Sequence, residues 1–124
     1  MVSIEAKKIV EKLSRDRNNN IELSTSQIRK FLAGLNGIHN RILAYQGTGE
    51  IIGDQLPPDI VDEIEYLKIK LIYQSGRERK VKDFMQLAEL EKRIDSIGNS
   101  KKKFEEFNRF IEGIVAYHKF EGGN

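Results

Sequence analysis

The stretch STSQIRKFLAGL, residues 24–35, decides the fold. It opens with Ser24 and Gln27, which have the spacing of a capping box at the start of a helix. The apolar positions that follow keep the spacing of one helix face: Ile28, Phe31, Leu32, Leu35, Ile38 and Ile42. We therefore expect a helix over residues 25–45, after which two glycines follow.

The same helical period recurs along the rest of the chain. Three consecutive asparagines at residues 18–20 predict a loop, and Pro57 with Pro58 suits the first turn of a helix. The further helices that we expect span residues 4–13, 58–75, 80–97 and 100–121. No segment alternates with the period of two that is typical of a strand. The expected fold is all-α, a single-domain bundle of about five helices over residues 1–124, with an N-terminal helix and loop at 1–20 and a flexible loop at 47–56.

The composition excludes several classes of protein. The chain has 124 residues with 21 Lys and Arg against 19 Asp and Glu, a net charge of +2, so a basic surface requires charges gathered on one face. Cysteine is absent, which excludes a disulfide scaffold, a thiol nucleophile and the usual structural zinc site. No apolar run has the length of a membrane span. We expect a cytoplasmic protein that does not contact a membrane.

Catalytic candidates are few. His39 and His118 are the two histidines, and each lies in line with apolar positions of a predicted helix. Such positions favour structural histidines, although a His pair that acts on RNA or holds a metal is the alternative. The carboxylates of the last two predicted helices alternate with Lys and Arg, which is typical of a solvated face. No metal-binding helix motif, nucleophile elbow or phosphate loop is present. We therefore expect a non-enzyme without metal or cofactor.

The helix predicted at residues 58–75 has apolar residues on two sides. Its core stripe consists of Ile60, Ile64, Leu67 and Leu71, and its second stripe consists of Tyr66, Ile69 and Tyr73. A helix that is apolar on both sides is either buried at the centre of the domain or contacts another subunit. Both alternatives remain open from the sequence, and our hypothesis for Tyr66, Ile69 and Tyr73 is a subunit interface.

Basic residues gather at one junction and along one helix. Arg77, Arg79, Lys80 and Lys82 surround the junction after the helix at 58–75, and Lys68 and Lys70 come shortly before it. On the helix at 25–45, Arg29, Asn36 and Asn40 share a stripe that Lys30 and Arg41 flank. Side chains of these types donate hydrogen bonds to phosphate and sugar oxygens. The pattern is typical of a solvated face or of an RNA-binding surface.

Three segments of the chain resemble a known family. They are STSQIRKF at residues 24–31, YLKIKLIYQSGR at 66–77 and FIEGIVAYHKFEGG at 110–123. Their order and spacing resemble the small subunit of the type III-A (Csm) CRISPR effector complex. The similarity extends over nearly all of the chain after Leu23, and none of the three segments carries a catalytic motif.

The resemblance implies a non-catalytic helical subunit that stacks in several copies along a ribonucleoprotein filament. Its implied partners are guide RNA, target RNA, the other subunits of the Csm complex and copies of itself. It would hold the RNA backbone without reading sequence, while other subunits cleave RNA and DNA. The matching positions that the resemblance implies as RNA contacts are Arg29, Lys68, Lys70, Arg77 and Lys119. Two rival classes remain: a helical adaptor that binds only protein, and a small nuclease or hydrolase.

Overall fold

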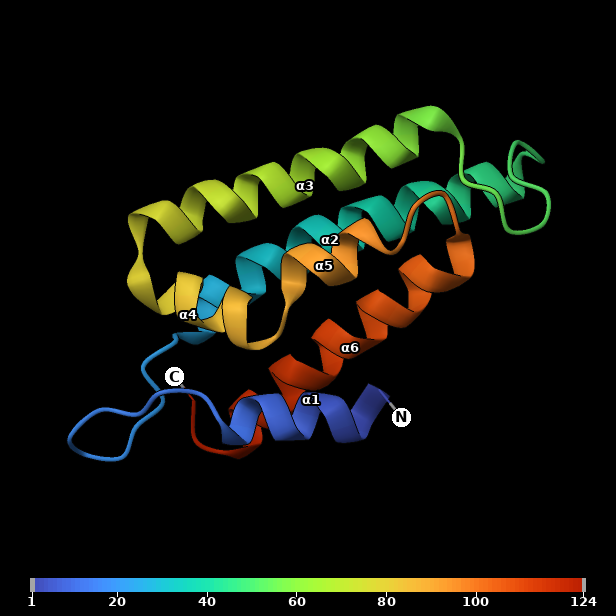
Figure 1. Cartoon of the computed structure of the whole chain (residues 1–124). Helices are drawn as coiled ribbons and strands as arrows, with labels where there is room; N and C mark the ends of the chain where they lie inside the picture. The colour runs from blue at the N-terminus through green and yellow to red at the C-terminus, as the bar shows by residue number, and fades with distance from the viewer. Residues whose placement is uncertain (1, 124) are drawn as a thin grey trace.

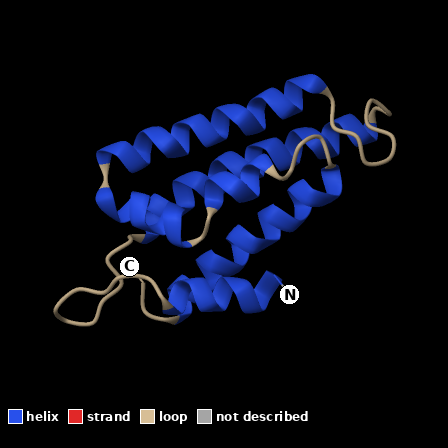
Figure 2. Ribbon diagram, viewed as in Figure 1, coloured by secondary structure: helices blue, strands red, loops and turns tan. Residues whose placement is uncertain are grey.

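Six helices make up the regular structure of residues 2–123, the part of the chain that the computed structural model describes (Figures 1 and 2). They are α1 (Val2–Glu11), α2 (Thr25–Gly47), α3 (Pro58–Arg77), α4 (Arg79–Leu87), α5 (Leu90–Asp95) and α6 (Lys101–Phe120). Within this range no strand forms, and two isolated bridges join loop residues. The predicted all-α fold is confirmed. Met1 and Asn124, the ends of the predicted domain, lie outside the described residues.

The start of α2 is the predicted capping box. The Ser24 hydroxyl accepts the N–H of Gln27 at 3.3 Å, and the Gln27 side-chain oxygen accepts the N–H of Ser24 at 2.9 Å. The helix ends at Gly47, slightly beyond the predicted end. Its buried residues are Ile28, Phe31, Leu35, Ile38 and Ile42. Local cap chemistry and one apolar face are therefore enough to define this helix.

The single helix predicted at residues 80–97 is wrong, because the chain breaks there into α4 and α5. Glu89 adopts left-handed backbone angles, with φ 53° and ψ 45°. In a straight helix, Ala88 and Leu90 would point about 200° apart. Both are fully buried in the structure. The break turns both side chains inward, and Arg93 Nε donates to the Ala88 carbonyl at 2.8 Å. The end of α3 is also shifted, since the cap is Glu78 and not the predicted Gly76.

Helices α2 and α3 lie side by side and antiparallel (Figure 1). Contacts at both ends fix this direction: Gln27 at the start of α2 binds Glu78 after α3, and Arg41 near the end of α2 binds Asp59 at the start of α3. Helix α6 packs against α2 and α1, while α4 and α5 cover the inner side of α3. The buried centre is dominated by residues of α6, namely Phe104, Phe110, Ile111 and Ile114.

Helix α1 packs closely on the C-terminal half of α6. A Cβ atom at Gly113 would lie 3.0 Å from the Cβ of Ala6, so a glycine lets the two backbones approach. Near the end of α6, the buried His118 places Nε2 2.6 Å from the Leu23 carbonyl oxygen. This contact joins the last turn of α6 to the segment that precedes α2.

The segment 48–57 links α2 to α3 and carries the two buried residues Ile51 and Leu56. The Leu56 N–H donates to the Asn99 carbonyl at 2.7 Å. The predicted flexibility of residues 47–56 stays a prediction. None of the helices described is both long and apolar enough to cross a membrane.

Candidate nucleic-acid interface

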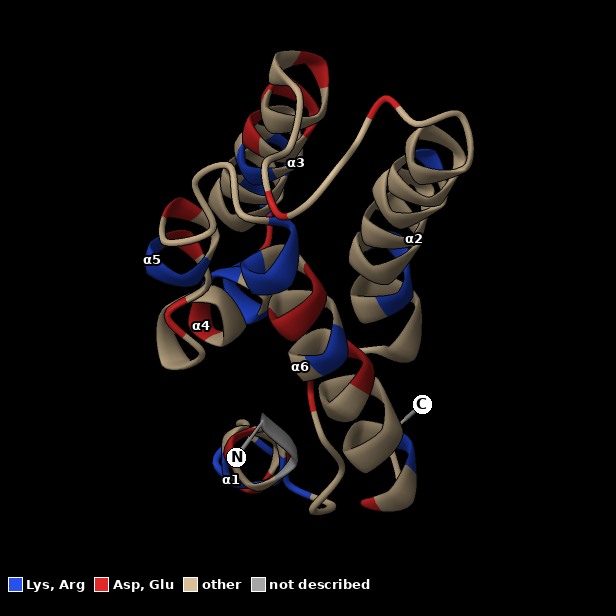
Figure 3. Ribbon diagram, turned by 90° about the vertical axis from the view of Figure 1, so that its right-hand side faces the viewer, with Lys and Arg blue, Asp and Glu red and all other residues tan. Residues whose placement is uncertain are grey.

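Helix α2 carries Lys and Arg but neither Asp nor Glu. Figure 3 shows this charge pattern, whereas blue and red alternate along α6. The basic residues of α2 are Arg29, Lys30 and Arg41. Because the net charge of the whole chain is only +2, α2 is a local concentration of positive charge on a nearly neutral protein.

The basic residues of α2 divide between two neighbouring stripes. Lys30, Gly34, Gly37 and Arg41 follow one another at spacings of four, three and four, and border α3. Arg29, Ala33, Asn36 and Asn40 follow the same spacings one residue earlier. This second stripe is therefore turned by about 100° away from α3. A surface that joins Arg29 to the α3 lysines would extend around α2, and this surface stays a prediction.

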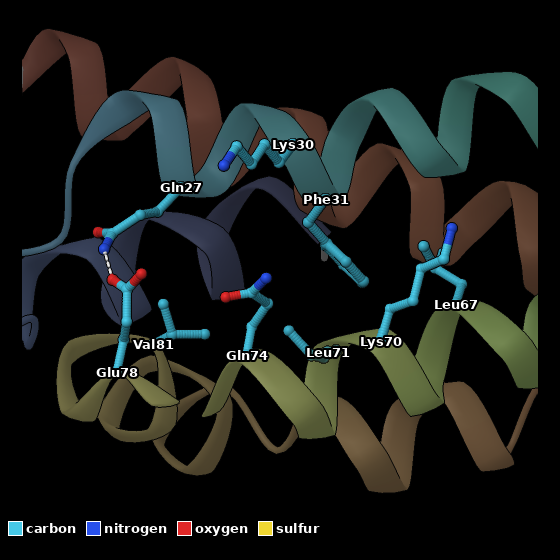
Figure 4. A pocket seen from close by; sticks show the side chains of 9 residues that line it. All are labelled: Gln27, Lys30, Phe31, Leu67, Lys70, Leu71, Gln74, Glu78 and Val81. Carbon is cyan, nitrogen blue, oxygen red and sulfur yellow. Dashed lines mark hydrogen bonds between the residues drawn. The ribbon is translucent and has the colours of Figure 1, made fainter. Parts of the chain in front are cut away.

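A groove runs between α2 and α3, with a volume of about 230 Å³ (Figure 4). Lys30 extends from α2 and Lys70 from α3, on opposite walls. Phe31, Leu71 and Val81 provide its apolar surface. The amide of Gln27 binds the carboxylate of Glu78 at one end. We call this feature the α2–α3 groove.

The α2–α3 groove continues along the helices into a shallower hollow that shares Leu67 and Lys70 with it. Gly34 allows α2 and α3 to approach closely here, because a Cβ atom at this position would lie 2.6 Å from Cδ1 of Leu67. Gly37 and Tyr66 line the continuation. The small residues of α2 thus leave a backbone-lined surface beside an aromatic ring.

Ion pairs separate the predicted RNA-binding residues into two groups. Three of them pair with carboxylates: Arg41 with Asp59 and Glu63, Lys68 with Glu65 and Asp95, and Arg79 with Asp83. The other five make no ion pair with the described residues: Arg29, Lys30, Lys70, Arg77 and Lys119. All five are exposed. The second group keeps its charge available to an external anion.

Arg41 belongs to a polar cluster that joins α2 to α3. Its guanidinium lies 2.9 Å from the Asp59 carboxylate and donates to the Tyr45 hydroxyl at 2.8 Å. The Tyr45 hydroxyl donates to Asp59, and this hydrogen bond holds the pKa of the Asp59 carboxyl below its usual value. The same hydrogen bond raises the pKa of Tyr45. The cluster holds the two helices together, so Arg41 has a structural role.

Lys68 lies on the inner side of α3, where its side chain is 14 % exposed. Its Nζ atom is 2.6 Å from Asp95 of α5 and 3.0 Å from Glu65. The hydrogen bond to Asp95 is the largest cause that raises the pKa of Lys68. Lys68 therefore lies away from the α2–α3 groove, and its ion pair with Asp95 joins α3 to α5.

The second apolar stripe of α3 is on the surface. Tyr66, Ile69 and Tyr73 are 59 %, 53 % and 62 % exposed, and Ile72 is also exposed. The alternative of a central helix buried on both sides is therefore wrong for this stripe. None of the described residues covers it, and the subunit interface predicted for these residues stays a prediction.

Tyrosines and cations alternate along the outer face of α3. Tyr66, Lys70, Tyr73 and Arg77 follow at spacings of four, three and four. Lys70 Nζ lies 4.6 Å from the centre of the Tyr66 ring, and the Arg77 guanidinium carbon lies 5.7 Å from the centre of the Tyr73 ring. Both distances are those of cation–π contacts. We call these four residues the tyrosine ladder.

The remaining predicted cations surround the end of the bundle where α2 begins. Arg77 and Arg79 flank Glu78, which binds Gln27 of α2. Lys119 follows His118, which binds the carbonyl that precedes the Ser24 cap. Arg79 is 91 % exposed and its pair with Asp83 is long, at 3.9 Å. Lys80 and Lys82 are exposed on α4. These residues place positive charge around one end of the α2–α3 groove.

The two histidines differ in their surroundings. His118 is buried and bonded to the Leu23 carbonyl, while His39 is half-buried on α2 with its Nδ1 unbonded within the described residues. Across residues 2–123, no group of three or more His, Cys, Asp or Glu side chains has the arrangement to hold a metal ion. The predicted absence of catalysis stays a prediction.

Fold and surface together define a class of protein: a small helical bundle in which two antiparallel helices, α2 and α3, carry exposed cations that make no ion pair with the described residues. Comparison with known proteins gives the family. The family model described as Csm2 Type III-A matches residues 3–124. The chain belongs to this family and is a small subunit of the type III-A CRISPR system, as its three recognisable segments had indicated.

The chain is similar to curated proteins named CRISPR system Cms protein Csm2 from three organisms. Identity is 33 % with the protein of Enterococcus italicus, covering 93 % of this chain and 85 % of the relative. It is 32 % with that of Streptococcus thermophilus, covering 95 % and 88 %. It is 30 % with that of Mycobacterium tuberculosis, covering 84 % and 79 %.

Sequence reasoning missed two features of this surface. It assigned the tyrosines of α3 to a subunit interface and the cations to RNA, although their spacing of four residues predicts that they touch. It also missed the link between Gln27 and Glu78, which are 51 residues apart and meet only in the folded chain. The first could have been found from helical spacing, and the second required the packing of α2 on α3.

Proposed function

We propose that this chain is a non-catalytic RNA-binding subunit of a type III-A CRISPR ribonucleoprotein. It holds guide and target RNA through phosphate and ribose, without reading sequence, and stacks in several copies along the filament together with the other Csm subunits. The observation that carries the proposal is the group of five exposed cations without ion pairs: Arg29, Lys30, Lys70, Arg77 and Lys119. Exposed cations that have no carboxylate partner can donate hydrogen bonds to phosphate oxygens.

Cations that already pair with carboxylates are poor candidates for this task. Arg41 and Lys68 would have to break contacts at 2.9 Å and 2.6 Å, which join α2 to α3 and α3 to α5. Arg79 can exchange its long contact with Asp83 for a phosphate at little cost, because an exposed pair contributes at most about 1 kcal/mol. We therefore narrow the proposed RNA contacts to the unpaired five together with Arg79.

A salt series tests the proposal. Binding of single-stranded RNA releases cations, so log K falls with log salt by about 0.7 for each phosphate contact. The double variant Arg29→Ala, Arg77→Ala should reduce this slope by up to about 1.4 and weaken all sequences alike. The matched control is Lys7→Ala, Lys8→Ala, which removes the same charge from exposed positions of α1. Affinities are measured with the full chain and RNAs of different sequence.

Equal slopes for the Arg29, Arg77 variant and the wild type would contradict this surface. The main alternative is an adaptor that binds only protein, which the exposed Tyr66, Ile69, Ile72 and Tyr73 favour. An adaptor would assemble normally with the other subunits and would not bind RNA even at low salt. Cleavage of RNA by the purified chain, lost on His39→Ala or His118→Ala, would instead support the third class, a small nuclease.

A further inference from the structure

We infer that the tyrosine ladder of α3 is a stacking platform for unpaired bases of single-stranded RNA. The inference rests on the proposed RNA-binding function and gives it a second mode of contact, to bases in addition to phosphates. Tyr66 and Tyr73 would each take one base, while Lys70 and Arg77 would take neighbouring phosphates.

Exposure of the rings is the first argument. Tyr66 and Tyr73 are 59 % and 62 % exposed, although a tyrosine ring is a large apolar surface that proteins bury or use. The hydroxyl of Tyr45, by contrast, is bound to Asp59 and Arg41. The two α3 rings therefore remain available to a partner.

The cations of the ladder are the second argument. Lys70 and Arg77 each lie over one ring, at 4.6 Å and 5.7 Å, and neither pairs with a carboxylate among the described residues. An aromatic ring has two faces, so a cation on one leaves the other for a base. Surfaces that bind single strands combine such rings with cations along the backbone. The ladder has both parts on one helix face.

Spacing is the third argument. Tyr66 and Tyr73 are two helical turns apart, or about 10 Å along the axis of α3. Stacked nucleotides of one strand rise by about 3.4 Å each, so the two rings are about three nucleotides apart. Lys70 lies between them and also lines the α2–α3 groove opposite Lys30. A strand that follows α3 would thus meet ring, cation, ring and cation in turn.

A protein partner fits the ladder less well. Covering Lys70 and Arg77 with protein removes both charges from water, and this costs free energy unless carboxylates meet them. A nucleic-acid strand carries a phosphate at every nucleotide, so it can provide a negative partner for each of the two cations. The neighbouring Ile69 and Ile72 carry no charge and lie on the side of α3 turned away from the groove, so they remain suited to a subunit contact. We therefore assign Tyr66 and Tyr73 to RNA and leave the isoleucines to the interface.

Oligonucleotides with and without bases test the inference on the full chain. An oligouridine and an abasic oligonucleotide of equal length carry the same phosphates. Tyr66→Leu, Tyr73→Leu should weaken binding of oligouridine by about five- to 150-fold per lost base contact and leave the abasic strand unaffected. Tyr66→Phe, Tyr73→Phe should retain wild-type affinity, because phenylalanine also stacks. Phe120→Leu removes an aromatic side chain that is 81 % exposed outside the ladder and is the matched control.

Each other outcome overturns the inference. Unchanged oligouridine affinity, or an equal loss on both strands, refutes base stacking while wild-type RNA binding stands. Reduced self-association with unchanged RNA affinity would assign the tyrosines to a second copy of the chain. A wild-type chain that binds neither strand at low salt refutes the proposed function together with the inference. Melting curves verify that the variants fold, as their exposed positions predict.

Discussion

Asp54 shows how one carboxylate can fix an irregular segment to a helix. It accepts the Ser100 hydroxyl at 2.7 Å and the Lys102 N–H at 2.7 Å, while its carbonyl accepts the Lys101 N–H at 2.7 Å. The Lys101 and Lys102 N–H groups belong to the first turn of α6, where backbone donors have no partner within the helix and negative charge is favoured. The Ser100 hydroxyl is the largest cause that holds the pKa of Asp54 below its usual value. Asp54 thus tethers the segment 48–57 to the central helix.

The pH dependence of stability should reveal this tether. A carboxyl whose pKa is lower in the folded than in the unfolded state stabilises the protein at pH values above its unfolded pKa of about 4. This stabilisation is lost as the pH falls through the pKa of the folded state. Asp54→Asn should therefore be less stable than the wild type at neutral pH, and the two should converge in acid. Thermal melting from neutral pH down to about pH 3 measures the difference. Asp62→Asn, at an exposed position of α3, is the control, and parallel curves for Asp54→Asn would contradict the role.

Sequence reasoning identified Ser24 but not Asp54, and the reason is distance along the chain. The Ser24 cap binds Gln27, three residues away, so helical spacing alone predicts it. Asp54 and Ser100 are 46 residues apart, and their contact depends on where the segment 48–57 returns to the bundle. The sequence likewise did not reveal which of the predicted RNA contacts form ion pairs, because Lys68 meets Asp95 only when α3 packs on α5.

At the scale of elements, the break between α4 and α5 has no signal in the sequence. Neither glycine nor proline stands at residues 87–90, and the apolar period continues through them. Burial of both Ala88 and Leu90 against the rest of the bundle outweighs the local preference for a straight helix. The starts of α2 and α6 were predicted correctly, because Ser24 and Ser100 cap their first turns.

Glu89 should be an unfavourable residue at its own position. Left-handed backbone costs a residue with a Cβ about 1–2 kcal/mol, and glycine adopts it readily. The ion pair between Glu89 and Lys92 is long, at 3.8 Å, and exposed, so removal of the Glu89 side chain costs little stability. We expect Glu89→Gly to raise the free energy of unfolding by about 1 kcal/mol. Denaturant unfolding measures it.

The control for this variant is Glu91→Gly, two residues further and inside α5. Glycine in a helix interior destabilises by up to about 1 kcal/mol, so the two variants should move in opposite directions. A loss of stability with both would mean that residue 89 does not hold its left-handed conformation in solution.

At the scale of the whole molecule, the exposed isoleucines of α3 predict an assembly contact. Ile69 is 53 % exposed, so Ile69→Asp buries no charge in the single chain and should change the free energy of unfolding by less than about 0.5 kcal/mol. If other subunits or further copies cover this position, the variant should assemble poorly. Sedimentation and co-purification with the other subunits measure assembly.

Ile52→Asp is the matched control, since Ile52 is 86 % exposed in the segment between α2 and α3. It introduces the same charge away from the proposed contact and should assemble as the wild type does. Normal assembly of the Ile69 variant would rule out the interface, and its global unfolding would mean that Ile69 is buried in solution.

The central position of α6 has a consequence for synthesis on the ribosome. This helix supplies the fully buried Phe104, Phe110, Ile111 and Ile114, and both α1 and α2 pack against it. Yet it is translated after all of the elements that it covers. The apolar faces of α1 and α2 that α6 covers therefore lack this partner until α6 has been synthesised, and transiently exposed apolar surface of this kind is prone to aggregate.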